Sequence, residues 1–198
     1  MRMKRVIPIV LAIGLGLIVV GLPFGYRAIV STKYRNFRIV EPGVLYRSGQ
    51  MSAEGFQRMA QEYGFKTVIS LRDLKDDGKI SPDTQEVAYC EANGIQHIIL
   101  SPANWYGTED KPAAVDKNLT KFLSIMDDPT TKPVLVHCFA GIHRTGGYVA
   151  LYRMEHHGWT ADDAIAEMKS MGTIRTTFDD EIPNYLQAYK PGRLRKKS

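Results

Sequence analysis

The sequence predicts a single α/β domain whose central, mostly parallel sheet is flanked by helices. Short apolar runs rich in β-branched residues alternate with segments of helical composition, the order typical of a parallel sheet. Residues that cap helices precede the helical segments, and glycines follow them. When an apolar N-terminal segment and a basic tail are set aside, roughly 150 of the 198 residues remain, a common size for one domain.

The first half of this domain contains three predicted strands and two predicted helices. The segment at 66–71 is apolar and β-branched, which indicates a buried strand. In chain order we expect a strand at 37–46 with a turn at 41–43, a helix at 53–62 capped by Ser52 and closed by Gly64, a strand at 66–71, a helix at 83–92 and a strand at 95–100.

The second half opens with a polar loop of 12 residues, Ser101 to Pro112, and loops of this length are often functional. It continues with a helix at 113–126, a strand at 133–137, a helix at 145–157 closed by Gly158, and helices at 161–171 and 182–189. In open α/β sheets, ligands bind beyond the carboxyl ends of the strands. We therefore expect the 101–112 loop to face the turn that follows residue 137.

Composition narrows the functional classes. Charged residues make up 24% and hydrophobic ones 44%, as in a folded globular protein. The net charge is +5, but seven basic residues lie at the two ends, so the middle is nearly neutral and nucleic-acid binding is not indicated. Only Cys90 and Cys138 occur, which excludes a disulfide framework and a set of four zinc-binding cysteines.

The N-terminus carries 19 consecutive uncharged, mostly apolar residues, Val6 to Phe24, behind three basic residues. A transmembrane helix needs about 20 such residues, so we expect residues 1–28 to be a single-pass membrane anchor, with the side of the catalytic domain open. A cleaved signal peptide, whose apolar core is usually shorter, and a buried core helix are the alternatives. The α/β domain then spans residues 29–190, and a basic tail spans residues 191–198.

The most diagnostic stretch follows the last predicted strand and reads His137-Cys138-Phe139-Ala140-Gly141-Ile142-His143-Arg144-Thr145-Gly146. A thiol becomes a good nucleophile when a helix N-terminus and backbone amides lower its pKa. Gly141 permits a tight loop of inward-pointing amides, Arg144 can contact an oxyanion bidentately, and Thr145 can hydrogen-bond the sulfur. The alternative is a structural cysteine at the end of a core strand.

These residues resemble the signature loop of the cysteine-dependent protein tyrosine phosphatase superfamily, and the short domain resembles its dual-specificity branch. Residues 45–50, 64–72, 150–153 and 158–159 are similar to segments of the bacterial, plant and fungal dual-specificity-like phosphatases. The resemblance extends from about residue 37 to about residue 188.

The resemblance implies a mechanism for phosphate monoesters. Cys138 attacks phosphorus to form a phosphocysteine, which water then hydrolyses. Thr145 helps the sulfur to leave, and His137 tunes the sulfur or is simply structural. Charge is stabilised by preorganised donors, so no metal or cofactor is needed. The phosphate-binding residues are Phe139, Ala140, Gly141, Ile142, His143 and Arg144.

The proton donor is less clearly marked. In relatives an aspartate roughly thirty residues before the cysteine protonates the leaving group, which ranks Asp110 first, Glu109 second and Asp116 third. Alternatively, Glu109 and Asp110 only cap the following helix. Arg72 and Asp73 either position the signature loop or form a surface ion pair.

Cys90 is the second cysteine, and two readings of it remain. Some relatives protect the oxidised nucleophile by a disulfide to a nearby cysteine, which the resemblance allows here. A small residue on the buried face of a helix is the favoured reading.

The preferred substrate is a phosphorylated protein carrying phosphotyrosine, phosphoserine or phosphothreonine. A phosphoinositide or inositol phosphate is the alternative, although the loop at 139–143 has no lysine, which phosphoinositide-specific relatives usually carry. A rhodanese-like sulfurtransferase is disfavoured by the five-residue gap between Cys138 and Arg144. A pseudophosphatase that binds phosphate without turnover is the non-enzymatic alternative.

Overall fold

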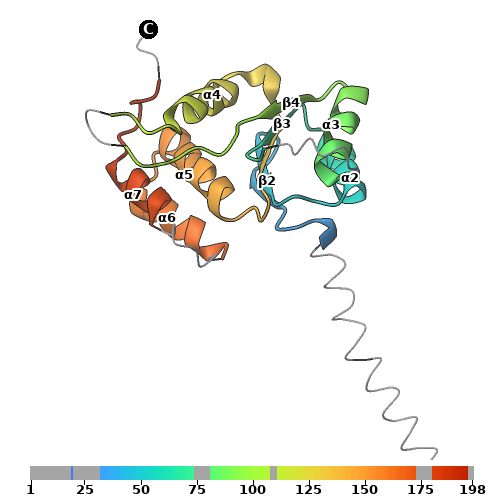
Figure 1. The fold of residues 1–198 in the computed structure, drawn as a ribbon, viewed down its shortest axis with the longest axis horizontal. Coiled ribbons are helices and arrows are strands. Elements are labelled where there is room, and N and C mark those ends of the chain that lie inside the picture. The colour runs from blue at the N-terminus through green and yellow to red at the C-terminus, as the bar shows by residue number, and fades with distance from the viewer. Residues whose placement is uncertain (1–18, 20–31, 74–80, 108–110, 173–179, 196–198) are drawn as a thin grey trace, which may run out of the picture.

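A five-stranded sheet forms the centre of the computed structural model, which describes residues 19, 32–73, 81–107, 111–172 and 180–195. The strands run in the order β1-β2-β5-β3-β4 (Figure 1). β1 is antiparallel to β2, and every other neighbouring pair is parallel. The predicted mostly parallel sheet is confirmed. The strands are β1 (Arg38–Glu41), β2 (Leu45–Ser48), β3 (Thr67–Ser70), β4 (Gln96–Ile99) and β5 (Val134–His137).

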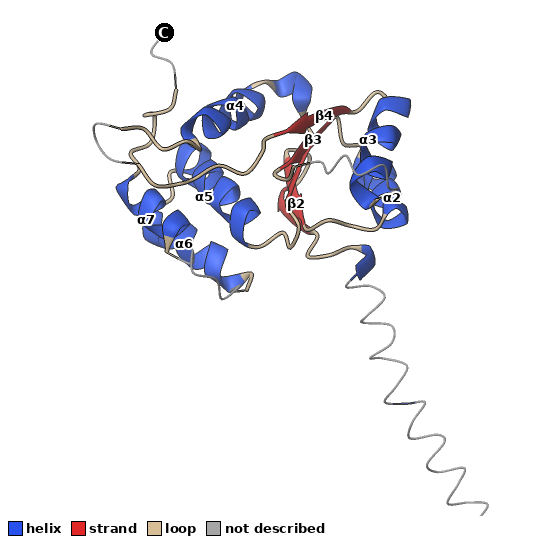
Figure 2. Cartoon of the chain, in the orientation of Figure 1, coloured by secondary structure: helices blue, strands red, loops and turns tan. Residues whose placement is uncertain are grey.

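Helices cover both faces of the sheet (Figure 2). On one side lie α2 (Ala53–Tyr63) and α3 (Pro82–Ala92). On the other side lie α4 (Asp116–Asp127), α5 (His143–His157), α6 (Ala161–Ser170) and α7 (Glu181–Ala188), with the short helix η1 (Pro129–Thr131) between α4 and β5. A parallel sheet buried on both faces needs such a three-layer arrangement.

The alternation of side chains along β5 divides the apolar core into two clusters. Val134 and Val136 belong to the larger cluster, which the helices α4 to α7 complete. Leu135 belongs to the smaller cluster, together with residues of α2 and α3. All three side chains are fully buried, because successive residues of a strand point to opposite faces and both faces are covered here.

Local capping signals act where the sequence indicates them. The side chains of Ser52 and Thr160 accept hydrogen bonds from backbone N–H groups in the first turns of α2 and α6. Gly64 and Gly158 end α2 and α5 in the left-handed conformation. These residues explain why the helix ends that carry such a signal are predicted within a residue or two.

Two helix starts differ from the prediction by two residues or more. α5 begins at His143, two residues early, so that Arg144 belongs to its first turn. α4 begins at Asp116, three residues later than the apolar pattern indicates. Val115 is buried before the helix and its N–H donates to the carbonyl of Asn104 at 3.0 Å. The residues directly before α4 form a turn instead, closed by the N–H of Asp116 on the carbonyl of Ala113 at 3.0 Å.

The predicted single-pass membrane location is corrected. A spanning helix needs about 20 apolar residues, and no helix within the described ranges is long and apolar enough to cross a bilayer. The longest of them, α5, has 15 residues. Apart from Val19, the predicted anchor at 1–28 lies outside the described residues.

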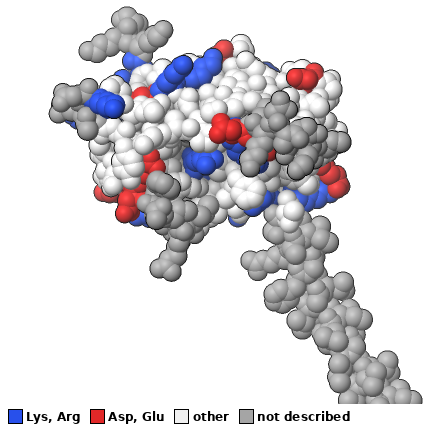
Figure 3. Space-filling model, viewed as in Figure 1, with Lys and Arg blue, Asp and Glu red and all other residues white. Residues whose placement is uncertain are grey.

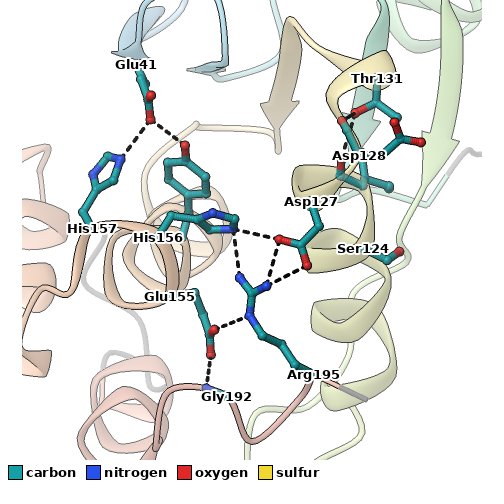
Figure 4. A network of polar contacts seen from close by, with 12 residues as sticks. Glu41, Ser124, Asp127, Asp128, Thr131, Glu155, His156, His157, Gly192 and Arg195 are labelled. Atoms are coloured by element: carbon teal, nitrogen blue, oxygen red, sulfur yellow. Dashed lines mark hydrogen bonds and ion pairs between the residues drawn. The ribbon is translucent and has the colours of Figure 1, made fainter. Parts of the chain in front are cut away.

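Charged side chains attach the last described residues to the domain (Figure 4). Arg195 pairs with Asp127 of α4 at 2.8 Å and with Glu155 of α5 at 2.7 Å. Near the same end of α5, Glu41 of β1 accepts from Tyr152 and lies 2.9 Å from the ring of His157. Exposed pairs stabilise weakly one by one, but together they connect β1, α4, α5 and the C-terminal segment.

We predict that Phe122→Ala destabilises the domain by about 3–5 kcal/mol, the cost typical of emptying a buried aromatic site. Phe122 is fully buried in α4 and its ring meets that of Tyr148 edge-on, at 5.2 Å between centroids. Urea unfolding measures the loss. The exposed neighbour Lys121→Ala is the control and should change stability by less than about 0.5 kcal/mol. Equal stability of the two variants would contradict the packing described here.

Candidate active site

The candidate site is built around the turn that joins β5 to α5. Cys138 follows the last residue of the central strand and is buried, 4% exposed. Gly141 adopts a φ of +73°, which favours glycine, and a Cβ there would lie 2.3 Å from the backbone nitrogen of Gly49. The close approach of the segment after β2 therefore requires glycine at this point of the turn.

Hydrogen-bond donors from other segments bind the carbonyl oxygens of the turn. The buried guanidinium of Arg47 donates to the carbonyl oxygens of Gly141 at 2.9 Å and Ile142 at 3.4 Å. The N–H of Gln50 donates to Phe139 at 2.9 Å. A further donor, Asn36 Nδ2, reaches the carbonyl of Ala140 at 2.9 Å. These bonds occupy carbonyl oxygens of the turn. The Gly141 N–H, in contrast, donates to the Cys138 sulfur at 3.2 Å.

The environment of Cys138 favours its thiolate. Burial opposes ionisation, but hydrogen-bonding groups of Thr145 and Gly141 and the charge of His137 outweigh it and lower the pKa of the thiol. Thr145 is fully buried in the first turn of α5, beside the sulfur. The structure thus brings together Cys138, Gly141, Thr145 and His137, as the sequence predicts.

Behind the turn, on the side of α3, a buried carboxylate lies between two imidazoles. Oε1 of Glu86 is 2.8 Å from His137 Nε2 and 3.0 Å from His97 Nε2. Burial opposes ionisation of Glu86, yet the two imidazoles bring its pKa to about 2. Burial also disfavours the charged form of His137, but the charge and hydrogen bond of Glu86 raise its pKa above the ordinary value. No sequence motif marks Glu86, which lies 51 residues before His137.

These three side chains are also the group in the described part of the chain that could hold a metal ion. Their oxygen–nitrogen distances are those of hydrogen bonds. Ligands about 2.0–2.1 Å from one tetrahedral zinc ion would be about 3.3 Å apart. The geometry therefore fits a hydrogen-bonded cluster.

Arg144 lies on the other side of the turn, at the wall of a cleft of about 360 Å³. Its side chain is exposed and Nη1 donates to the carbonyl of Leu71 at 3.2 Å, just beyond β3. The signature turn and the 101–107 segment both contribute to the cleft, as the sheet topology predicts. The lining side chains used below are Leu71, Leu100, Trp105, His143, Arg144 and Tyr148.

Trp105 anchors the 101–107 segment at this cleft. Its buried ring meets Tyr148 of α5 and Tyr185 of α7 edge-on, with centroids 5.8 and 5.1 Å apart. Its backbone N–H donates to Oε1 of Glu181 at 2.6 Å. Glu181 also lines the cleft and was not identified from the sequence, since it lies 76 residues away from Trp105.

The three proton-donor candidates are placed differently. Glu109 and Asp110 lie outside the described residues. Asp116 begins α4, where its carboxylate accepts from the hydroxyl of Tyr185 at 2.6 Å and from Arg193 at 3.0 Å. Because α7 and the C-terminal segment occupy this carboxylate, the structure does not bring it to the turn.

Two arginines flank Phe139, the exposed residue directly after Cys138 (53% exposed). The guanidinium carbons of Arg35 and Arg72 lie 3.9 and 5.2 Å from the centroid of its ring. Arg72 also pairs with Asp83 at 2.9 Å and donates to Gln50, whereas Asp73 is exposed. Cations thus reach the mouth of the turn from remote segments, although residues 139–143 contain no lysine.

Cys90 and Cys138 are both free and belong to different core clusters. Cys90 is fully buried on α3, and burial, reinforced by the charge of Glu86, raises its pKa to about 12. This environment fits the reading of Cys90 as a small core residue.

The family described as "PTP-NADK: DSP-PTPase phosphatase fused to NAD+ Kinase" matches residues 31–182. Inositol diphosphatase DSP3 of Arabidopsis thaliana is 26% identical over 81% of this chain and 73% of its own length. Probable NAD kinase 2, chloroplastic, of Oryza sativa subsp. japonica is 32% identical over 54% of this chain. This chain spans 10% of that kinase.

Solved structures share the fold. The catalytic core of Siw14 has a TM-score of 0.62 at 20% identity, over 82% of this chain and 89% of that chain. TpbA of P. aeruginosa has a TM-score of 0.61 at 24% identity, over 81% and 88%. At these identities the likeness concerns the fold alone. The family match covers most of the chain, which therefore belongs to the PTP-NADK family, within the cysteine-based dual-specificity phosphatase-like superfamily.

Proposed function

We propose that this chain hydrolyses phosphate monoesters through a phosphocysteine intermediate, with Cys138 as the nucleophile. The observation that carries the proposal is the buried thiol of lowered pKa, which accepts from the Gly141 N–H at 3.2 Å. A lowered pKa raises the fraction of thiolate, the nucleophilic form. The turn and the first turn of α5 form an oxyanion site of the kind that helix N-termini provide.

In the first step, the sulfur forms a bond to phosphorus while the bond from phosphorus to the ester oxygen breaks. The leaving oxygen takes a proton from the general acid. Backbone amides of residues 139–144 and the guanidinium of Arg144 stabilise the charge on the three equatorial oxygens. In the second step, water attacks phosphorus, the bond to sulfur breaks with help from Thr145, and inorganic phosphate leaves.

Asp110 is our proposed general acid, with Glu109 as the alternative. Both follow the segment that Trp105 anchors between α5 and α7. Asp116 is disfavoured because its carboxylate is engaged by Tyr185 and Arg193.

For the substrate, we propose a phosphorylated protein side chain, with phosphotyrosine the best fit to the cleft. Leu71, Leu100, Trp105 and Tyr148 give the cleft apolar and aromatic walls, which suit an aryl ring. Among the relatives, the tyrosine-protein phosphatase cdcA of Emericella nidulans is 29% identical over 54% of this chain, and this chain spans 18% of it.

An inositol phosphate is the second candidate, and a specific observation favours it. Arg35 and Arg72 beside Phe139 offer cations to phosphate groups other than the one under attack. The inositol diphosphatase of Arabidopsis thaliana noted above supports this candidate. On the face seen in Figure 3, blue and red side chains lie scattered among white ones and form no broad basic surface.

We predict that Cys138→Ser abolishes hydrolysis of a chromogenic aryl phosphate measured without added metal, because serine provides no comparable nucleophile at this site. Cys90→Ser, the matched control at the other cysteine, should keep most of the activity. Turnover undiminished in Cys138→Ser would refute the role of Cys138 as the nucleophile. Turnover absent from the wild-type chain would refute the enzymatic proposal and favour a phosphate-binding pseudophosphatase.

For the proton donor, we expect Asp110→Asn to slow hydrolysis of esters with poor leaving groups by about 10²-fold or more. Esters of good leaving groups, such as nitrophenolate, need little protonation of the leaving oxygen. Their hydrolysis should therefore slow much less. Glu109→Gln is the control. The ranking is wrong if Glu109→Gln gives the leaving-group dependence and Asp110→Asn does not.

Arg35→Ala separates the two substrate classes. If a polyphosphorylated inositol is the substrate, its kcat/KM should fall roughly tenfold, which corresponds to about 1.4 kcal/mol, while that of a phosphotyrosine peptide stays within about twofold. Arg38→Ala removes an exposed arginine of β1 as the control. A uniform loss for both substrates would argue against a role of Arg35 in selecting polyanions.

A further inference from the structure

The cluster of Glu86, His97 and His137 lies behind the signature turn, where it contributes nothing to the cleft surface. Its members come from α3, β4 and the last residue of β5. Glu86 and His137 are almost completely buried, with 3% and 1% of their side chains exposed. A buried carboxylate is costly unless it is paired and hydrogen-bonded. The buried Glu86–His137 pair therefore has a larger electrostatic effect on neighbouring groups than a surface ion pair would have.

We propose that Glu86 is a positioning residue, whose carboxylate holds the His137 ring by a hydrogen bond directly behind the nucleophile Cys138 and acts on the thiol through that ring. The proposal rests on the proposed role of Cys138 and extends it from the turn to the opposite face of the sheet. Glu86 touches neither the cleft nor the sulfur in this structure, so its influence on the reaction passes through His137.

The hydrogen bonds define this arrangement. Nε2 of His137 is 2.8 Å from Glu86 Oε1, while His97 Nε2 shares the same oxygen at 3.0 Å. The second oxygen, Oε2, accepts from Gln50 Nε2 at 3.4 Å. Gln50 also binds the turn through its backbone, since its N–H donates to the carbonyl of Phe139. The carboxylate thus contacts His137, the residue before Cys138, and is linked through Gln50 to Phe139, the residue after it.

The other charged groups near this pair are few. Asp83 of α3 acts on His137 in the same direction as Glu86, but Arg72 neutralises it at 2.9 Å. Arg47 of β2 donates to the carbonyl of Gly141 in the turn, and its guanidinium interacts with the charge of the Cys138 thiolate. Arg144 of α5 donates to the carbonyl of Leu71. Two imidazoles contact Glu86, those of His137 and of His97 on β4, and of the two only His137 is adjacent to Cys138 in the chain.

The sign of the effect makes the proposal testable with Glu86→Gln. Glutamine keeps the size of the side chain and an oxygen that can accept from His137, and it removes only the negative charge. Acting directly on Cys138, removal of a negative charge would ease thiolate formation and lower the thiol pKa. Acting through His137, it lets the imidazole become neutral and raises the thiol pKa. The two routes therefore predict opposite shifts.

The experiment measures the rate of Cys138 alkylation by iodoacetamide as a function of pH, which requires no substrate. We expect the midpoint of Glu86→Gln to move upward by about one pH unit, and alkylation at acidic pH to slow roughly tenfold. Glu91→Gln, on the exposed side of the same helix, should leave the profile unchanged. An unchanged or lowered midpoint in Glu86→Gln would overturn the proposal.

Two further measurements show whether the effect passes through His137. In a His137→Gln background, adding Glu86→Gln should give no further upward shift, and a full additional shift would refute the coupling. In the wild-type chain, the imidazole resonances of His137 should titrate above pH 6.5, the ordinary value for histidine. Titration at or below that value would also refute the proposal, whether or not the variants fold.

Because alkylation needs only a folded chain, these results remain distinct from the phosphatase assay. A chain without hydrolytic activity whose Cys138 still responds to Glu86→Gln would refute the proposed function and leave the coupling intact. An active chain with an unresponsive Cys138 would do the reverse.

Discussion

The central position of β5 is the constraint on which the rest of the structure depends. With β2 on one side, β3 on the other and helices over both faces, its backbone and side chains are fully engaged. The chain can leave this strand only at the carboxyl edge of the sheet, where it must turn immediately into α5. Cys138 occupies the first position of that turn, so the thiol directly follows the central, fully buried strand.

Buried charges hold the turn from two directions. Arg47 reaches from β2 to the carbonyl oxygens of Gly141 and Ile142. From α3, Glu86 reaches His137 on the other side of the sheet. Both charges are costly to bury and both are satisfied by hydrogen bonds, which favours a single arrangement of the turn. The same contacts that fix its shape also set the electrostatic environment of the sulfur.

The surroundings of the turn divide into two regions with different chemical preferences. The cleft beside Arg144 has apolar and aromatic walls, held in place by Trp105 between α5 and α7. Directly after Cys138, the guanidinium groups of Arg35 and Arg72 flank the ring of Phe139. One region suits an aryl group and the other a second anionic group, which is why the two substrate classes lead to separable expectations.

The sequence alone determined the features that depend on neighbouring residues. Alternating apolar runs and caps such as Ser52 and Thr160 predict most elements, because strands and helix ends form through local contacts. The spacing from Cys138 to Arg144 predicts the signature turn for the same reason. Local reasoning had limits even here. The apolar N-terminal run suggested a membrane location that is corrected, and the apolar pattern placed the start of α4 three residues early, where the chain forms a turn. Only the tertiary structure revealed Arg35, Arg47, Glu86 and Glu181 as parts of the site. Each lies far along the chain from the group it supports, and only folding of the sheet brings such partners together.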